Sequence, residues 1–162
     1  MKNIIRVILA LLILSSLTAA GLYQVKIQVD PWLEPVVTEG ELQATEWISK
    51  NTPDDAKFVA GIFGGEVIMG MTTRAPLVGG DWANAPDPTK NMNDAQSVFI
   101  TPSSKDAHAI CKEHNCTYVS VPTERQVHTG YGWVEVDRGK FEDEDYFKLV
   151  YENSDVMIYE VI

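Results

Sequence analysis

The segment 58–82 contains the side chains whose types and spacing come nearest to a ligand-binding site. Glu66 and Arg74 lie at the two ends of a predicted short helix, and Asp81-Trp82 follows a pair of glycines. A carboxylate and a guanidinium at helix ends also complement the helix dipole, which is their more frequent role. A tryptophan on a loop needs something to pack against, such as a sugar ring, a partner protein or its own domain. Glu66, Arg74, Asp81 and Trp82 are therefore candidates for binding a ligand or partner, and none is a candidate for catalysis.

A second group of reactive side chains lies in and just after a predicted helix: His108, Cys111, His114 and Cys116. Zinc is not favoured, because Cys111 and His114 fall on the apolar stripe of the helix and His108 points away from it. No second Cys or His pair completes a tetrahedron. A disulfide between Cys111 and Cys116 fits their spacing and a place outside the cytoplasm, and two free buried thiols are the alternative. We expect no metal site and no cofactor.

Three further patterns are weaker indicators of chemistry. Asn115 begins a glycosylation sequon with Cys116 and Thr117, although a disulfide through Cys116 would disfavour its modification. His128 has neither a paired acid nor a nucleophile with a local signature, so no hydrolase triad is indicated. The acidic run 142–145 lacks the alternating ligands of a calcium-binding loop. The sequence therefore offers no residue to which a catalytic role can be assigned.

Length and charge restrict the class of protein. The chain has 162 residues, enough for one modest hydrophobic core, and carries 23 acidic and 13 basic residues for a net charge of −10. This acidity repels phosphate backbones, so a nucleic-acid partner is not expected. It also disfavours a basic contact with anionic lipid head groups, and by itself it identifies no substrate.

The N-terminus predicts a membrane anchor in residues 1–24. Residues 7–23 carry no charge, and together with the positions just before them about 20 residues can cross a bilayer. Lys2 and Arg6 precede this run, so the positive-inside rule places the N-terminus in the cytoplasm and the domain outside it, as a single-pass protein of the cell membrane. A cleaved signal peptide is the alternative, because the run ends in the small residues 15–21. Either way the domain is expected to be extracytoplasmic.

The anchor is followed by a predicted linker, residues 25–37, in which two prolines oppose a continuous helix. The domain, residues 38–162, opens with a capping box formed by Thr38 and Glu41, and Pro53 ends the helix that this box begins. The other predicted elements are a strand at 58–62, a helix at 66–73 entered through Gly64-Gly65, a strand at 77–78, a long loop at 79–93, an extended piece at 98–100, a helix from Ser103 or Ser104 to Lys112, a strand at 117–121 and a hairpin turning at Asn153-Ser154. This order predicts a small α/β sandwich of two or three layers, with a mixed sheet and a C-terminal β-hairpin.

Several short motifs in this domain resemble one family. Ala44, Trp47-Ile48 and the Asn-Thr-Pro of 51–53 precede the first strand, and 118–121 and 149–161 form the closing strands. This order is similar to the last membrane helix and extracytoplasmic C-terminal domain of polytopic lipid-linked-sugar glycosyltransferases. That superfamily includes the dolichyl-phosphate-mannose-dependent enzymes and the catalytic subunit of oligosaccharyltransferase. The resemblance implies the same kind of α/β domain behind a membrane span.

The resemblance also indicates which functional residues of the family are missing from this sequence. In the oligosaccharyltransferase subunit, the turn after the first strand carries Trp-Trp-Asp-Tyr-Gly, which binds the acceptor hydroxyl, and an Arg follows. Here Gly65, Ile68 and Arg74 match that frame, but 61–64 read Gly-Ile-Phe-Gly and offer no side-chain acceptor. The family's catalytic acids and metal ligands lie between earlier membrane helices, which this sequence does not contain.

The resemblance therefore implies a membrane-anchored accessory or partner-binding domain for protein or envelope glycosylation, without catalysis of its own. Its expected partners are the lipid bilayer and a polytopic membrane glycosyltransferase or another envelope protein. The first alternative is a tethered ligand- or protein-interaction module unconnected with glycosylation. The second is an enzyme fragment that is active only when it is paired with a polytopic partner.

Overall fold

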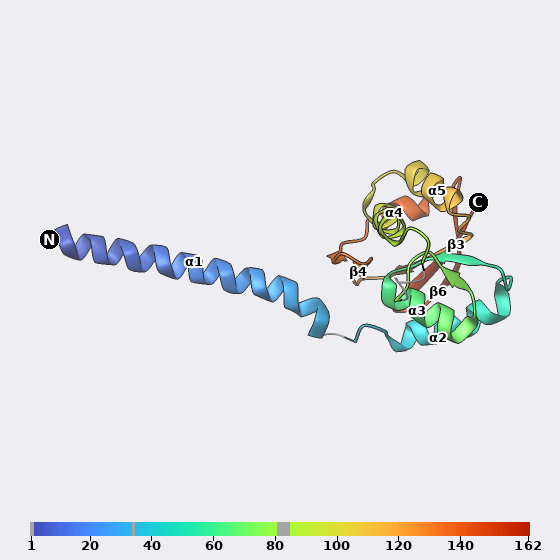
Figure 1. Ribbon diagram of the computed structural model, residues 1–162, viewed down its shortest axis with the longest axis horizontal. Coiled ribbons are helices and arrows are strands. Elements are labelled where there is room, and N and C mark those ends of the chain that lie inside the picture. Colours follow the sequence, from blue (N-terminus) through green and yellow to red (C-terminus); the bar gives the residue numbers. More distant parts are fainter. Residues whose placement is uncertain (1, 34, 81–84) are drawn as a thin grey trace. The chain divides into compact units, whose positions relative to one another are not determined.

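The computed structural model describes residues 2–33, 35–80 and 85–162, and the chain divides into two compact units (Figure 1). The first unit holds one long helix, α1 (Lys2–Leu33), and the second is Val37–Ile162. Within α1, the stretch Asn3–Leu33 is long and apolar enough to cross a membrane. None of the residues in its most apolar window is buried.

Helix α1 extends further than the predicted anchor, because residues 25–33, predicted to be linker, continue it. Pro31 lies in the last turn of α1, where its missing N–H removes a single intrahelical hydrogen bond. Lys26 pairs with Asp30 one turn further along, and such a pair favours the helix over this part of the chain. The prolines thus restrict where the helix ends and do not prevent it.

The second unit is built on a five-stranded mixed sheet with the order β2-β1-β3-β7-β6. Its strands are β1 (Lys57–Val59), β2 (Ala75–Pro76), β3 (Tyr118–Pro122), β6 (Phe147–Glu152) and β7 (Val156–Val161). β1 runs parallel to β2 and β3, whereas β7 runs antiparallel to β3 and β6. A separate two-stranded ribbon pairs β4 (Val127–His128) with β5 (Trp133–Val134), and a short 3-10 helix, η1 (Gly139–Glu142), precedes β6.

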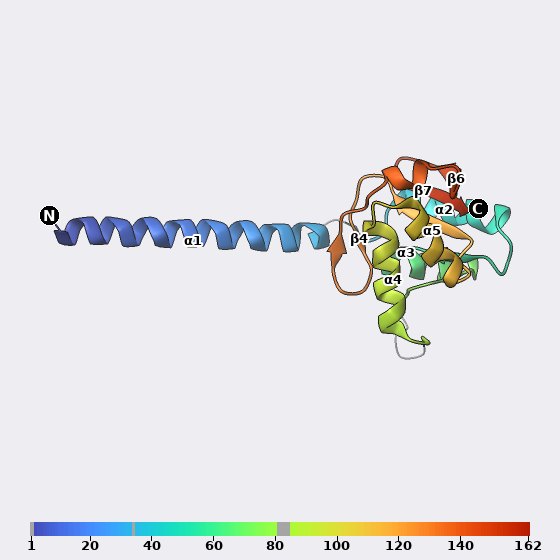
Figure 2. The same cartoon turned by 90° about the horizontal axis from the view of Figure 1, so that it is seen from above.

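Helices cover both faces of the sheet (Figure 1). They are α2 (Glu39–Asn51), α3 (Ile62–Thr72), α4 (Pro88–Ile100) and α5 (Ser104–Glu113). α2 and α3 pack together on one face, and α4 and α5 pack together on the other. α4, seen end-on in Figure 1, runs lengthwise beside α5 in Figure 2.

The alternation of side chains along the strands divides the buried residues into two cores. On β1, Phe58 enters the core under α2 and α3, and its neighbour Val59 enters the core under α4 and α5. Ile158 and Tyr159 divide in the same way on β7. The result is a three-layer α/β sandwich with a mixed sheet and a closing hairpin, which confirms the predicted fold class.

The first part of the domain differs from the sequence prediction at the paired glycines. β1 ends at Val59, and α3 begins at Ile62, so Gly64 and Gly65 lie inside the helix and do not lead into it. A Cβ on Gly65 would lie 2.3 Å from the carbonyl oxygen of Val78. The missing side chain thus lets α3 approach the chain that leaves β2, which is a packing role. The strand predicted at 77–78 forms two residues earlier, as β2.

Helix α4 (Pro88–Ile100) replaces the last part of the predicted loop 79–93, from Pro88 onward, and all of the extended piece 98–100. Asp87 caps the helix, its carboxylate accepting a hydrogen bond from the backbone N–H of Lys90 at 3.3 Å, and Pro88 occupies the first turn. Proline is favoured there because its missing N–H has no partner in an α-helix anyway. Pro88, one of the two prolines that suggested a loop, thus belongs to a helix start.

The remaining predicted elements are confirmed. The capping box of Thr38 and Glu41 is formed in both directions, and α2 ends before Pro53. Ser103 caps α5, accepting from the backbone N–H of Asp106 at 3.2 Å. β3 and the β6–β7 hairpin also lie where the alternation of apolar residues placed them.

Candidate functional site

Arg74 is a buried cation that joins the C-terminal ends of α2 and α3. Its guanidinium donates to the carbonyl oxygens of Thr72 at 2.6 Å, Thr52 at 2.8 Å and Ser49 at 3.3 Å, and pairs with Asp54 at 2.9 Å. Only 8% of its side chain is exposed. These carbonyls have no partner within their own helices, so Arg74 satisfies them and complements both helix dipoles. Its contacts are those of a structural residue.

Glu66 lies away from the contacts of Arg74. Because α3 begins at Ile62, Glu66 is in the second turn of the helix and not at its start, where the sequence placed it. It is exposed, and its carboxylate lies so close to Gly80 that a Cβ there would be 1.6 Å from Oε1. The other two candidates, Asp81 and Trp82, lie outside the described residues.

An aromatic cluster lies beside the first turn of α3. The ring of Phe63 is 5.8 Å from that of His128 and 6.0 Å from that of Trp133, and the last two are 5.3 Å apart. Burial lowers the pKa of His128. Gly61 begins the helix without a side-chain cap, and residues 61–64 contribute the ring of Phe63 and no carboxylate. No pattern in the sequence indicated that the β4–β5 ribbon packs here.

Cys111 and Cys116 belong to a helix-ending turn. Asn115 has a φ of 55°, the N–H of Cys116 donates to the carbonyl of Cys111 at 2.8 Å, and that of Asn115 donates to Lys112 at 3.1 Å. This is the Schellman pattern of a helix C-terminus. It is commonly accompanied by contact between an apolar side chain in the last turn and one just after the helix, and in this chain those two positions hold Cys111 and Cys116. Both thiols are free and buried, so the structure contains the alternative to the predicted disulfide. Burial raises the pKa of Cys111 to about 12 and that of Cys116 to about 11, which keeps both protonated and unreactive at neutral pH.

The same turn holds the sequon at Asn115. The left-handed backbone of Asn115 is tolerated by asparagine better than by most residues, so a structural reason accounts for its presence. The hydroxyl of Thr117 accepts from the backbone N–H of Lys57 at 3.2 Å. The sequon is thus part of the contact between the end of α5 and β1, and its glycosylation stays a prediction.

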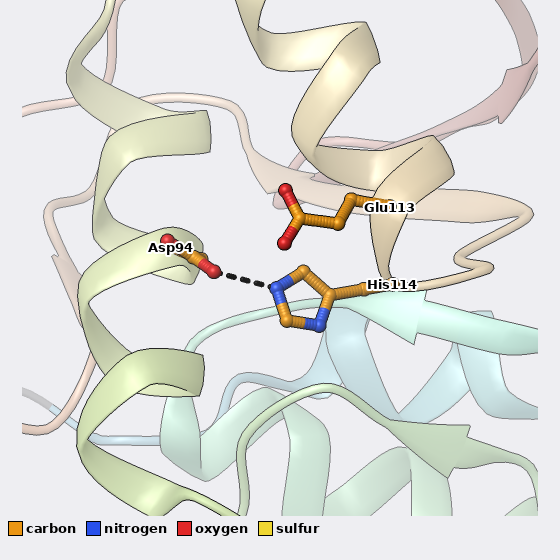
Figure 3. Close-up of side chains that lie close together, drawn as sticks. All are labelled: Asp94, Glu113 and His114. Atoms are coloured by element: carbon orange, nitrogen blue, oxygen red, sulfur yellow. Dashed lines mark hydrogen bonds and ion pairs between the residues drawn. The ribbon is translucent and has the colours of Figure 1, made fainter.

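A polar cluster that the sequence did not predict bridges α4 and the end of α5. Asp94 faces Glu113 and His114 (Figure 3), and Asp94 Oδ2 lies 2.6 Å from His114 Nε2. The ammonium of Lys90 lies 2.5 Å from Asp94, 2.8 Å from Glu113 Oε1 and 3.4 Å from His114 Nε2. All four side chains therefore meet at one point. Lys90 and Asp94 lie one turn apart on α4, so a helix predicted there would have brought these two side chains together. The contact with Glu113 and His114 could not be predicted in this way, because it depends on how α5 packs against α4.

The electrostatics of this cluster favour charged groups. Burial raises the pKa of Asp94, but hydrogen bonds from Lys90 and His114 outweigh this effect and leave it below the ordinary value. Hydrogen bonds to Asp94 and Glu113 raise the pKa of Lys90. Two acidic side chains therefore face one lysine and one histidine side chain, in a place where the side chain of Lys90 is 45% exposed. Of the polar groups described above, these are the ones arranged to hold a cation.

No protein-family model and no curated protein sequence matches the chain. Among solved structures, the chain is similar to the C-terminal globular domain of oligosaccharyltransferase from Archaeoglobus fulgidus, with 19% identity and a TM-score of 0.57. The match covers 79% of this chain and 100% of that domain. A second crystal structure of such a domain from the same organism has 18% identity, covers 80% of this chain and 99% of that chain, and gives a TM-score of 0.49. The chain thus has the fold of an oligosaccharyltransferase C-terminal globular domain.

Proposed function

We propose that the protein is a membrane-anchored, extracytoplasmic accessory domain that binds a polytopic membrane glycosyltransferase and has no catalysis of its own. The observation that carries the proposal is the fold. The whole length of an oligosaccharyltransferase C-terminal globular domain is matched by this chain. The sequence motifs around α2 and the β6–β7 hairpin, which suggested the same superfamily, lie in that domain.

The turn at the start of α3 supports an accessory role. Where the resembling motif would supply an acid, this chain has Gly61, Ile62, Phe63 and Gly64, and their surroundings are aromatic. Arg74, which matched the motif's frame, is bound to helix carbonyls and is not available to a substrate. A domain with this scaffold and without these polar groups is suited to hold a partner in place.

Helix α1 supports the membrane part of the proposal. An exposed helix of this length and apolarity needs a non-aqueous environment, and a bilayer provides one. Lys2 and Arg6 lie before its apolar stretch, so the N-terminus is cytoplasmic and Val37–Ile162 lies outside the cytoplasm. We expect the full-length chain to remain in membranes through carbonate washes, and external protease to digest the domain. A mature N-terminus near Gly21 would instead identify a cleaved signal peptide.

The decisive experiment is co-purification of the full-length chain in mild detergent from its native membranes, followed by mass spectrometry. We expect a polytopic glycosyltransferase in stoichiometric amount. In a matched control variant, α1 is replaced by an unrelated single-span helix. If residues 37–162 bind the partner, this variant should still co-purify with it. Purification without such a partner, together with retention of the chain on a glycan or solute panel, would favour a tethered interaction module unconnected with glycosylation. Transfer from a lipid-linked donor by the chain alone would contradict an accessory role.

A further inference from the structure

We propose that Asp94, Glu113 and His114 form a binding site for a zinc ion, which enters by displacing the ammonium of Lys90. The potential ligand atoms of the three residues all lie within 4.8 Å of one another. They come from two helices that pack side by side, so their convergence is set by the fold (Figure 3). This site is independent of the proposed partner-binding function.

The position of Lys90 indicates where a cation is held. Its Nζ atom contacts Asp94, Glu113 and His114, the same three residues that would bind the metal. Lys90 is long and flexible, and nearly half of its side chain is exposed, so it can turn into solvent. Ion pairs of this exposed kind contribute little to stability, and their loss opposes metal binding only weakly.

Charge favours the exchange. With Lys90 in place, the two carboxylates and the ammonium leave one unit of negative charge, in a chain whose net charge is already −10. A divalent ion in place of the ammonium neutralises both carboxylates. His114 would then carry its proton on Nδ1 and present the lone pair of Nε2, the atom that faces Asp94 in the structure.

The donor set selects the metal. One imidazole and two carboxylates give three protein ligands, and the exposed side of the cluster leaves room for water as a fourth, as in open zinc sites. Calcium takes six to eight oxygen ligands, and magnesium prefers an all-oxygen octahedron, so the imidazole disfavours both. The site differs from the Cys–His set considered in the sequence, because the fold uses His114 and leaves both cysteines in the core.

The test is a zinc titration of the full-length chain in detergent at pH 7.4, read by calorimetry and by the visible absorption of cobalt(II) in the same site. We expect one ion per chain. His114→Gln and Asp94→Asn should each weaken binding at least about tenfold, since even indirect partners of a metal ligand change affinity by that much. Millimolar magnesium should not displace zinc.

The result specific to this proposal concerns Lys90. Because its ammonium competes with the metal, Lys90→Met should tighten zinc binding severalfold, whereas Lys50→Met, which removes a similar helix ion pair with Glu46, should not. His108→Gln is the matched control for His114, since both histidines belong to the α5 region and His108 Nε2 contacts Ile162. Absence of stoichiometric binding, displacement by magnesium, equal loss in His108→Gln, or weaker binding in Lys90→Met would each overturn the proposal. Thermal unfolding of each variant shows that it is folded.

Discussion

Arg74 and Lys90, one in each helix layer of this domain, are held in opposite ways. In the α2–α3 layer, Arg74 is buried and bound mainly to backbone carbonyls of both helices. In the α4–α5 layer, Lys90 lies at the surface and is bound to two carboxylates and an imidazole. A cation that satisfies buried carbonyls cannot leave without stranding them. A cation that pairs with side chains open to water can be exchanged, so, of these two described cations, Lys90 is the one arranged as in a binding site.

The largest effect on stability is expected at Arg74. Arg74→Ala leaves the carbonyl oxygens of Thr72 and Thr52 without their donor in a buried place, and we expect the free energy of unfolding to fall by about 3 kcal/mol. Urea unfolding followed by circular dichroism measures this change. Asp54→Ala is the control, because its side chain is 96% exposed and should hardly matter. A similar midpoint for wild type and Arg74→Ala would show that the α2–α3 layer does not depend on its cation.

The paired glycines of α3 offer a second way to test this layer. Gly65→Ala places a methyl group 2.3 Å from the carbonyl of Val78, so backbone must move, and we expect a loss of about 2 kcal/mol. Gly64→Ala meets only the Cβ of Ala60, at 3.8 Å, and should be neutral or stabilising by up to about 1 kcal/mol through helix propensity. Equal effects of the two substitutions would contradict the close approach of α3 to the chain after β2.

Lys140 brings a buried cation into the α4–α5 layer as well. Its ammonium donates to the carbonyls of Phe99 at 2.7 Å and Thr101 at 2.9 Å, and burial lowers its pKa to about 8 from 10.5. Between these two pH values the unfolded chain binds more protons than the folded one, so folding becomes more favourable as pH rises. We expect the unfolding free energy of the wild type, measured relative to Lys140→Met, to increase by at least about 1 kcal/mol from pH 8 to 10.5. If the difference in unfolding free energy between wild type and Lys140→Met did not change with pH, the ammonium of Lys140 would be solvated in the folded chain.

The smallest effect is expected at Lys90. Lys90→Met removes exposed ion pairs to Asp94 and Glu113, and such pairs often contribute nothing measurable to stability. We therefore expect the urea midpoint at pH 7 to stay within experimental error of the wild type. A loss as large as that of Arg74→Ala would remove the contrast between the two layers and would make Lys90 a structural residue.

The parts of the fold that follow from local patterns were predictable. Alternating apolar residues predicted β3 and the β6–β7 hairpin, and the capping box of Thr38 predicted the start of α2. Helix α4 was missed because prolines on both sides of Asp87 are typical of loops, although Asp87-Pro88 is also a helix start. The glycines of α3 were misplaced because the close approach that requires Gly65 is made with Val78, beyond the helix. The local sequence shows that residue 65 is a glycine, but it does not show that the backbone of Val78 passes close to it.

The polar cluster could not be predicted for the same reason. Asp94 and His114 lie twenty positions apart and meet only because α4 and α5 pack side by side. The four candidates at 66–82 are near one another in sequence, but the contacts of Arg74 lead to α2 and those of Glu66 to Gly80. Nearness along the chain is a reliable guide only where a single element positions both residues.

The position of β7 has a consequence for how the domain is made. β7 lies inside the sheet, between β3 and β6, although it is the last strand of the described chain. At translation rates of about 5–20 residues per second, the roughly 40 residues from Pro122 to Val161 take about 2–8 s to be synthesised. During that time β3 presents an edge with no strand beside it, the kind of surface that pairs with other chains. Shielding of the β3 edge during synthesis would therefore decide how much of the protein reaches its native state.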